Sequence, residues 1–210
     1  MDCRADVVPK LSPTPHMNPL SENAFLVKEH VGMFKAANNF DVYNPENGEL
    51  LLECREERLG FFTKMLRFTD YKRYTPFHIE IREPQGQSLI HIKRGISLFL
   101  SNVSVLDENE QLIGRFKQKF FSIGGKFDVL ASDDSILCSL SGKWNGWNFS
   151  FGREGVEFAS VSKKWSGLGK ELFTSADNYM LTIDPSVEKD SPIRKLIMAA
   201  VMSIDMVLKE

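Results

Sequence analysis

Hydrophobic and polar residues alternate along most of this chain, and a period of two is typical of β-strands with one buried face. Residues 40–43 (FDVY) alternate, the turn 44–48 (NPENG) follows, and the alternation resumes at 50–55 (LLLECR). An Asn-Gly turn between two alternating segments is a strong signal for a β-hairpin. The sequence therefore predicts a hairpin here.

The same pattern recurs further along the chain. A second hairpin is predicted from 77 to 92 around the turn 84–86, and a third pairs Val103 and Val105 with Ile113 across 107–110. Further strands are predicted at 127–129, 136–140, 147–151, 156–158 and 179–183. This makes ten to twelve short strands, at the spacing that is typical of a sandwich or a barrel.

The end of the chain follows a different pattern. From Leu196 to Leu208 every residue is apolar except Ser203 and Asp205, and Pro192 suits the first turn of a helix. A helix that is apolar nearly all round is either a membrane span or the centre of a core. At about 1.5 Å per residue the run covers roughly 20 Å, short of the roughly 30 Å hydrocarbon layer of a bilayer.

An aspartate inside the run adds a further cost in lipid. We therefore predict a helix at 192–209 that is buried in protein. Its predicted buried residues include Leu196, Ala200, Ile204 and Asp205. A closed sheet around this helix would bury the helix, and the helix would fill the interior of the sheet. We therefore predict a mainly β fold, a closed barrel around a C-terminal helix.

One domain is predicted for residues 21–210, because no linker divides them. Residues 1–20 carry four prolines and few large apolar residues, so they are predicted to be a disordered leader. The N-terminus has no apolar core of the kind that a signal peptide needs. The three cysteines are widely spaced and odd in number, which favours a reducing compartment, so we expect a cytoplasmic protein.

Composition is that of an ordinary globular protein, with 42% hydrophobic and 26% charged residues and a net charge of −2. No overall charge attracts it to nucleic acid or to an anionic membrane, so such an attraction must come from a local patch. The segment 58–74 offers one, because basic and aromatic residues are interleaved there. Its predicted lipid-binding residues are Arg58, Lys64, Arg67, Lys72 and Arg73.

Rings that enter the headgroup layer and cations that meet anionic lipid would place this segment at a membrane surface. The alternative is a short helix or loop packed on the barrel with a solvated basic rim.

A recognisable pattern is formed by the stretches 38–44, 48–50, 76–82 and 92–94, and then by 161–167 (VSKKWSG) leading into 170–179 (KELFTSADNY). These stretches resemble the phospholipid scramblase family, which has the tubby-like fold. The family, like this chain, ends in one apolar helix that contains an aspartate. The resemblance covers residues 20–209 and implies twelve antiparallel strands around the C-terminal helix. LURP-one-related proteins of the same superfamily remain an alternative label.

The resemblance also implies a calcium-binding segment, which on this chain would use Ser175, Asp177, Tyr179 and Asp184. Calcium prefers six to eight oxygens with several carboxylates, and this set supplies few. Residues 179–183 also alternate as a strand, which would direct neighbouring side chains to opposite faces. A strand followed by a polar turn is therefore favoured over a calcium site, and calcium is the only cofactor considered. The palmitoylated cysteine-rich segment of lipid-scrambling family members has no counterpart here.

No enzyme motif is present in the sequence. The histidines show no metal or catalytic spacing, and His78 and His91 are predicted to lie on the polar face of one hairpin. The favoured function is a non-enzymatic, phospholipid scramblase-like protein that binds an anionic phospholipid membrane surface peripherally and contributes to transbilayer phospholipid movement. The alternative is an interaction module with a protein or nucleic-acid partner, although the net charge gives nucleic acid no support.

Overall fold

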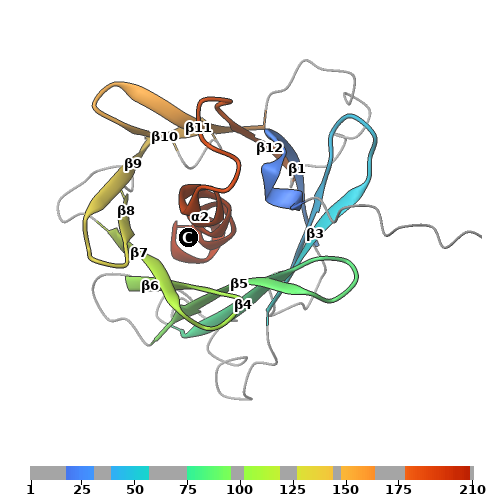
Figure 1. The fold of residues 1–210 in the computed structure, drawn as a ribbon, viewed down its shortest axis with the longest axis horizontal. Helices are drawn as coiled ribbons and strands as arrows, with labels where there is room; N and C mark the ends of the chain where they lie inside the picture. Colours follow the sequence, from blue (N-terminus) through green and yellow to red (C-terminus); the bar gives the residue numbers. More distant parts are fainter. Residues whose placement is uncertain are drawn as a thin grey trace, which may run out of the picture.

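The computed structural model describes residues 18–30, 39–56, 75–95, 102–118, 127–143, 148–163 and 178–208. Within these ranges twelve strands form one closed antiparallel barrel. Each strand pairs with its neighbours in sequence, and the last strand closes the barrel against the first. A single long helix runs through the middle (Figure 1). The predicted mainly β barrel around a C-terminal helix is confirmed.

The strands are β1 (Ala24–Glu29), β2 (Phe40–Tyr43), β3 (Leu50–Glu56), β4 (Phe77–Arg82), β5 (Ser88–Arg94), β6 (Asn102–Asp107), β7 (Leu112–Gln118), β8 (Phe127–Ala131), β9 (Ile136–Lys143), β10 (Asn148–Arg153), β11 (Val156–Ser162) and β12 (Asn178–Ile183). A short 3-10 helix, η1 (Pro19–Ser21), precedes them, and the helix α2 (Pro192–Leu208) follows.

The core consists of the inward side chains of the strands together with α2. Each strand contributes alternate residues, so that Phe40 and Val42 of β2 are fully buried while Asp41 and Tyr43 are half-buried on the outside. From Leu196 to Ile204 the helix is buried, as predicted, with the following exposed fractions: Leu196 0%, Ala200 6% and Ile204 6%. The side chain of Asp205 lies outside the described part. Among the described residues, no helix is both long and apolar enough to cross a bilayer.

Five hairpins share a β-bulge close to their turns. The register shifts by one residue between the first and second strand, and this leaves one extra residue on the second strand. The extra residue is apolar each time and packs at the edge of the core: Leu51, Leu89, Ile113, Leu137 and Phe158. Bulges are common at barrel rims, where they increase the local twist of a strand.

These bulges decide which residues of a strand face inward, and they explain one error of the sequence-based prediction. In the third hairpin, Val103 and Val105 face Phe116 and Gly114 rather than Ile113, which is the bulged residue. In β11 the inward residues are Ala159 and Val161, whereas Val156 is 55% exposed. A strict period of two fails where a strand carries one extra residue.

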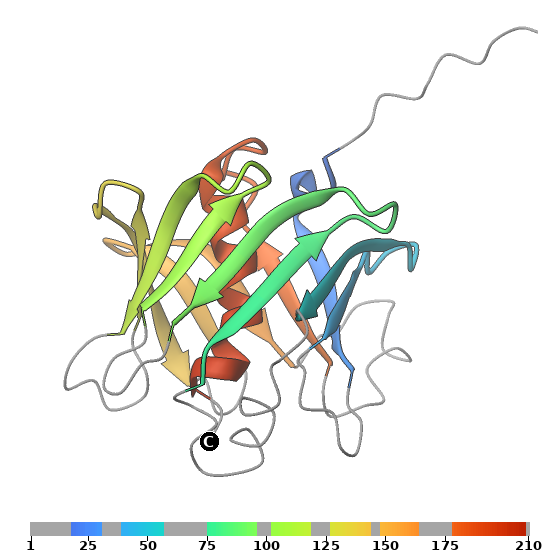
Figure 2. The same ribbon diagram turned by 90° about the horizontal axis from the view of Figure 1, so that it is seen from below.

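The connections sort to the two ends of the barrel (Figure 2). The short turns 44–49, 83–87, 108–111, 132–135 and 154–155 lie at one end, together with the connection 184–191 that leads into α2. We name this the turn end. At the opposite end, the loop end, the connections 30–39, 57–76, 95–101, 119–126, 144–147 and 163–177 begin and finish. This alternation is a consequence of antiparallel strands joined in sequence order.

The start of the described chain is tied to α2 at the turn end. Leu20, which the sequence analysis assigned to the leader, is 1% exposed and belongs to the core. Arg194 in the first turn of α2 donates to the carbonyls of Leu20 (3.2 Å) and Glu22 (2.8 Å) and to Asn23 Oδ1 (2.7 Å). Packed structure therefore begins a few residues before the predicted boundary, and residues 1–17 of the predicted leader lie outside the described part.

Candidate functional site

The predicted lipid-binding residues Arg58, Lys64, Arg67, Lys72 and Arg73 all lie outside the described residues. The two points where their segment leaves and re-enters the barrel are described, at the ends of β3 and β4. The amide of Glu56 donates to Asn39 Oδ1 at 3.1 Å. The segment therefore leaves the barrel at the end of β3, which is hydrogen-bonded to Asn39 of the connection 30–39.

The other attachment point, Thr75 just before β4, is buried and held by a buried arginine. The Thr75 carbonyl accepts a hydrogen bond from Arg94 Nη2 at 2.6 Å, and both residues are buried. The Arg94 guanidinium also lies over the Phe77 ring, 4.7 Å from its centre, in cation–π geometry. Since a buried cation and an aromatic ring hold this end, the basic segment starts and finishes at fixed positions on the loop end.

The predicted calcium set is not brought together by its described members. Tyr179 is buried at the start of β12, whereas Asp184 follows the end of that strand, about 16 Å away at roughly 3.3 Å per residue. The Asp184 carboxylate accepts from the Ser186 amide at 2.9 Å, and this pattern of hydrogen bonds from Ser186 lowers the pKa of Asp184.

One calcium ion cannot take both of these residues as ligands, so the described members do not fit the ion. Ser175 and Asp177 lie outside the described residues, and a role for them in calcium binding stays a prediction. Among the residues that the structure describes, no three His, Cys, Asp or Glu side chains gather in a way that could hold a metal ion.

The outer face of β2, β3 and β4 carries a continuous ion-pair network. Arg55 lies between Asp41 (2.6 Å) and Glu53 (3.0 Å), and Arg82 Nη2 reaches the other oxygen of Glu53 at 3.0 Å. His30 Nε2 lies 2.7 Å from the second oxygen of Asp41. Asp41, Arg55, Glu53 and Arg82 thus each pair with an opposite charge on a neighbouring strand.

Asp41 is the most enclosed carboxylate of this network. Burial by itself would raise its pKa, but the hydrogen bonds from Arg55 and His30 outweigh burial and hold the pKa below its usual range. This network was not predicted from the sequence. The sequence places charges of opposite sign at outward positions of β2, β3 and β4. Which of these charges meet depends on the register between the strands, and the sequence alone does not give that register.

His78 and His91 lie side by side on the outside of the second hairpin, as predicted. Their ring centres are 5.5 Å apart, and His91 Nε2 lies 3.2 Å from Ser88 Oγ. Glu80 is directly opposite His91 in the register, and Lys93 is opposite His78. The pair is one more part of a mixed polar surface along this side of the barrel.

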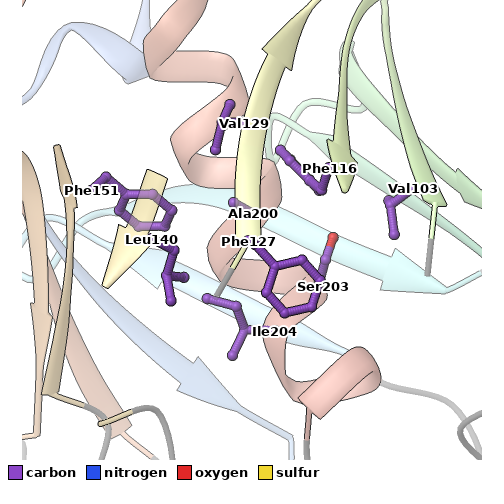
Figure 3. Close-up of a pocket in the computed structure, with 9 residues that line it drawn as sticks. All are labelled: Val103, Phe116, Phe127, Val129, Leu140, Phe151, Ala200, Ser203 and Ile204. Carbon is purple, nitrogen blue, oxygen red and sulfur yellow. The ribbon is translucent and has the colours of Figure 1, made fainter. Parts of the chain in front are cut away.

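The inside of the barrel contains a small cavity in its loop-end half (Figure 3). Its volume is about 20 Å³, and it is lined by Val103, Phe116, Phe127, Val129, Leu140, Phe151, Ala200, Ser203 and Ile204. The only polar side chain in this lining, Ser203, donates its hydroxyl to the Ala199 carbonyl at 2.7 Å. Such a space is no larger than one water molecule needs, so in this arrangement it has no room for a lipid chain.

Comparison with known proteins identifies the family. A family model described as Scramblase matches residues 20–210, which is nearly the whole chain. The chain belongs to the Scramblase family. A search of curated proteins finds no match. Family membership and the closed barrel around a helix agree with each other, and together they support a scramblase-like protein of the tubby-like architecture.

Proposed function

We propose that this Scramblase-family protein binds the surface of phospholipid membranes peripherally, and that assemblies of several chains contribute to the movement of phospholipid between leaflets. The observation that carries the proposal is the family match over residues 20–210. We also propose that the protein acts at the cytoplasmic face of membranes, because its two described cysteines, Cys54 and Cys138, are buried free thiols.

The placement of the basic segment supports surface binding. Its two attachment points are Glu56, at the end of β3, and Thr75, just before the neighbouring strand β4, both at the loop end. Aromatic rings at 61–62, 68, 71 and 74 alternate in sequence with the five basic residues. Rings of this kind enter the headgroup region, and each Lys or Arg near an anionic surface contributes about 1 kcal/mol to binding.

The position of α2 supports a peripheral mode. This helix is enclosed by the twelve strands, with Ile197, Met198 and Val201 fully buried, so its apolar surface is already covered by protein. Moving a polar headgroup across a bilayer needs a hydrophilic path through the hydrocarbon. We therefore assign the transport role to an assembly rather than to one chain.

Liposome flotation tests the binding. Wild type should float with vesicles that contain phosphatidylserine, and a variant with Lys64, Arg67, Lys72 and Arg73 changed to Gln should stay at the bottom of the gradient. A matched control removes four basic charges elsewhere, at Lys93, Arg115, Arg153 and Lys189. It loses the same net charge and should float like wild type.

Equal recovery of both quadruple variants would contradict the role of the segment. Failure of wild type to float would contradict the proposed function and favour the interaction-module alternative. Transport is measured separately, as the fraction of fluorescent phospholipid that becomes accessible to an external reductant. We expect this fraction to rise only at protein densities that allow several chains per vesicle.

A further inference from the structure

Acidic residues gather at the turn end of the barrel. The connections there include one basic residue, Lys189, and eleven acidic ones: Glu46, Glu49, Glu83, Glu108, Glu110, Asp133, Asp134, Glu154, Asp184, Glu188 and Asp190. Four of the acidic residues form ion pairs with basic residues of the strands and of α2: Lys93, Arg115, Arg153 and Lys195. The other seven still outnumber the one basic residue, so two turn ends would repel each other.

The outer face of β2, β3 and β4 is also poorly suited to contact between copies. Its charges are already paired within the chain, through Asp41, Arg55, Glu53 and Arg82. A second copy could only exchange these pairs for equivalent ones, and such exchanges on a protein surface contribute little free energy.

The outer face of β9, β10 and β11 is different near the turn end. These strands are consecutive in the barrel wall (Figure 1). Among the described residues, the two exposed large apolar side chains both lie here, Ile136 with 47% and Val156 with 55% exposure. Arg153 links them, because its backbone pairs with Val156 and its Nη1 donates to the Ile136 carbonyl at 3.0 Å. We name Ile136, Arg153, Val156 and Glu157 the corner surface.

A hollow of about 280 Å³ lies directly beside Val156. Its lining includes three serines, Ser139, Ser141 and Ser150, as well as Val156 and Glu157 at its edge. The serines alternate along β9 and β10 with core residues such as Leu140 and Phe149, so the hollow lies on the outside of the barrel. A protruding apolar group beside a hollow suits a two-fold contact, because each copy then supplies both shapes to the other.

The charges of the corner surface also complement a second copy. Glu157 is exposed and forms no ion pair with any residue that the structure describes. Arg153 has the opposite sign and lies on the neighbouring strand, where the adjacent Gly152 pairs with Glu157. Its own ion pair with Glu154 is exposed on both sides and contributes little. A two-fold contact can therefore place Arg153 of each copy against Glu157 of the other.

We propose that two copies of this chain meet through the corner surface, in a contact with two-fold symmetry. This rests on the proposed function, which assigns transport to an assembly, and it adds the surface at which the chains meet. Three strands about 4.8 Å apart and six residues long outline roughly 300 Å² per copy. A stable complex buries about 800 Å² per partner. The contact is therefore weak, and it forms where a membrane concentrates the protein.

Cysteine crosslinking in the full chain tests this contact. The background variant replaces Cys3 with Ser. Cys54 and Cys138 stay unreactive because they are buried, and burial raises the pKa of Cys138 to about 12. Val156→Cys is compared with Gln85→Cys, an exposed turn-end position on the opposite hairpin β4–β5. A short bismaleimide is added on phosphatidylserine-containing vesicles and in concentrated solution. We expect several-fold more crosslinked dimer for Val156→Cys under both conditions.

Exchange of the charges gives a second measurement. In the Val156→Cys protein, Glu157→Arg and Arg153→Glu should each reduce the dimer, since each places like charges across the contact. The two changes together should restore it, because the pairs are then reversed. Damage to the barrel by either substitution would not be repaired in this way. Absence of rescue would show that these charges do not meet, and would overturn the proposed contact.

Flotation of every variant is measured in parallel and should equal that of wild type, because peripheral binding needs only one chain. If the proteins float but Val156→Cys crosslinks no more than Gln85→Cys, the contact is wrong and the proposed function stands. If the proteins do not float, the proposed function fails. The crosslinking in concentrated solution then decides by itself whether two copies meet at the corner surface.

Discussion

At the scale of single residues, Arg194 shows how this fold holds a charge inside. Its side chain is 1% exposed, and burial lowers its pKa. All five of its acceptors are neutral: the carbonyls of Leu20, Glu22, Val187 and Glu188 and the amide oxygen of Asn23. Among the described residues no carboxylate pairs with the guanidinium, so the stability of the buried charge depends on this set of hydrogen bonds.

Arg194→Lys tests that dependence. A lysine has three donors on one nitrogen and cannot reach five acceptors spread around a planar group. We expect the variant to lose about 2–4 kcal/mol of unfolding free energy, measured by urea titration. The neighbouring Lys195→Gln is the control, because its exposed ion pair with Glu108 contributes less than about 1 kcal/mol. A variant Arg194→Lys as stable as wild type would contradict the role of the five acceptors.

Asp41 gives a prediction for pH dependence. Its pKa in the folded state lies below the ordinary value of 3.8, so its contribution to stability is complete above that value and is lost as the pH falls towards the folded-state pKa. Wild type should therefore exceed Asp41→Asn in stability at neutral pH, and the difference should shrink below pH 3.8.

Urea titrations of both proteins at neutral and acidic pH measure this difference. Glu46→Gln, in the exposed turn between β2 and β3, is the control for removing one carboxylate without disturbing the ion-pair network. A difference between wild type and Asp41→Asn that stays constant across the acidic range would show that the network does not act through the charge of Asp41.

At the scale of elements, most of the hairpins could be predicted from the sequence. Which residues of each strand face inward could not always be predicted. The alternation at 40–43 and the Asn-Gly turn predicted the first hairpin, and the pairing of β2 with β3 confirms it. At Ile113 the same rule gave the wrong partner for Val103 and Val105, because a bulge adds one residue to the strand. Which strand carries the extra residue depends on how it packs on the core, and a single-strand pattern does not contain that information.

Gly114 in β7 packs closely against both β8 and α2. A Cβ placed there would meet the carbonyl oxygen of Leu130 and would lie 2.7 Å from Leu196 Cδ2 of α2. Gly114→Ala should therefore push α2 away from β7 and lower the unfolding free energy by about 1–3 kcal/mol. Thermal or urea unfolding measures this loss.

The matched control is Gly95→Ala just after β5, where a Cβ meets nothing within 4 Å. We expect this variant to stay within about 0.5 kcal/mol of wild type. If Gly114→Ala is as stable as Gly95→Ala, then α2 does not pack against β7 as closely as described.

At the scale of the whole molecule, the buried helix was predictable and the gathering of acidic residues at the turn end was not. The length of the apolar run and Asp205 indicated a core helix, and the number of strands indicated a closed sheet. The acidic residues of the turn end come from connections that are far apart in sequence, for example 44–49 and 184–191. Only the order of the strands in the closed barrel shows that they gather at one end.

The central claim is that the closed barrel, with α2 inside it, is the form that meets the membrane. Hydrogen exchange of the α2 backbone amides, measured with and without phosphatidylserine vesicles, tests this most directly. We expect slow exchange along the helix from Leu196 to Ile204 in both states, because the strands enclose it in both. Loss of that protection on vesicle binding would show that the helix leaves the barrel, and would contradict the claim.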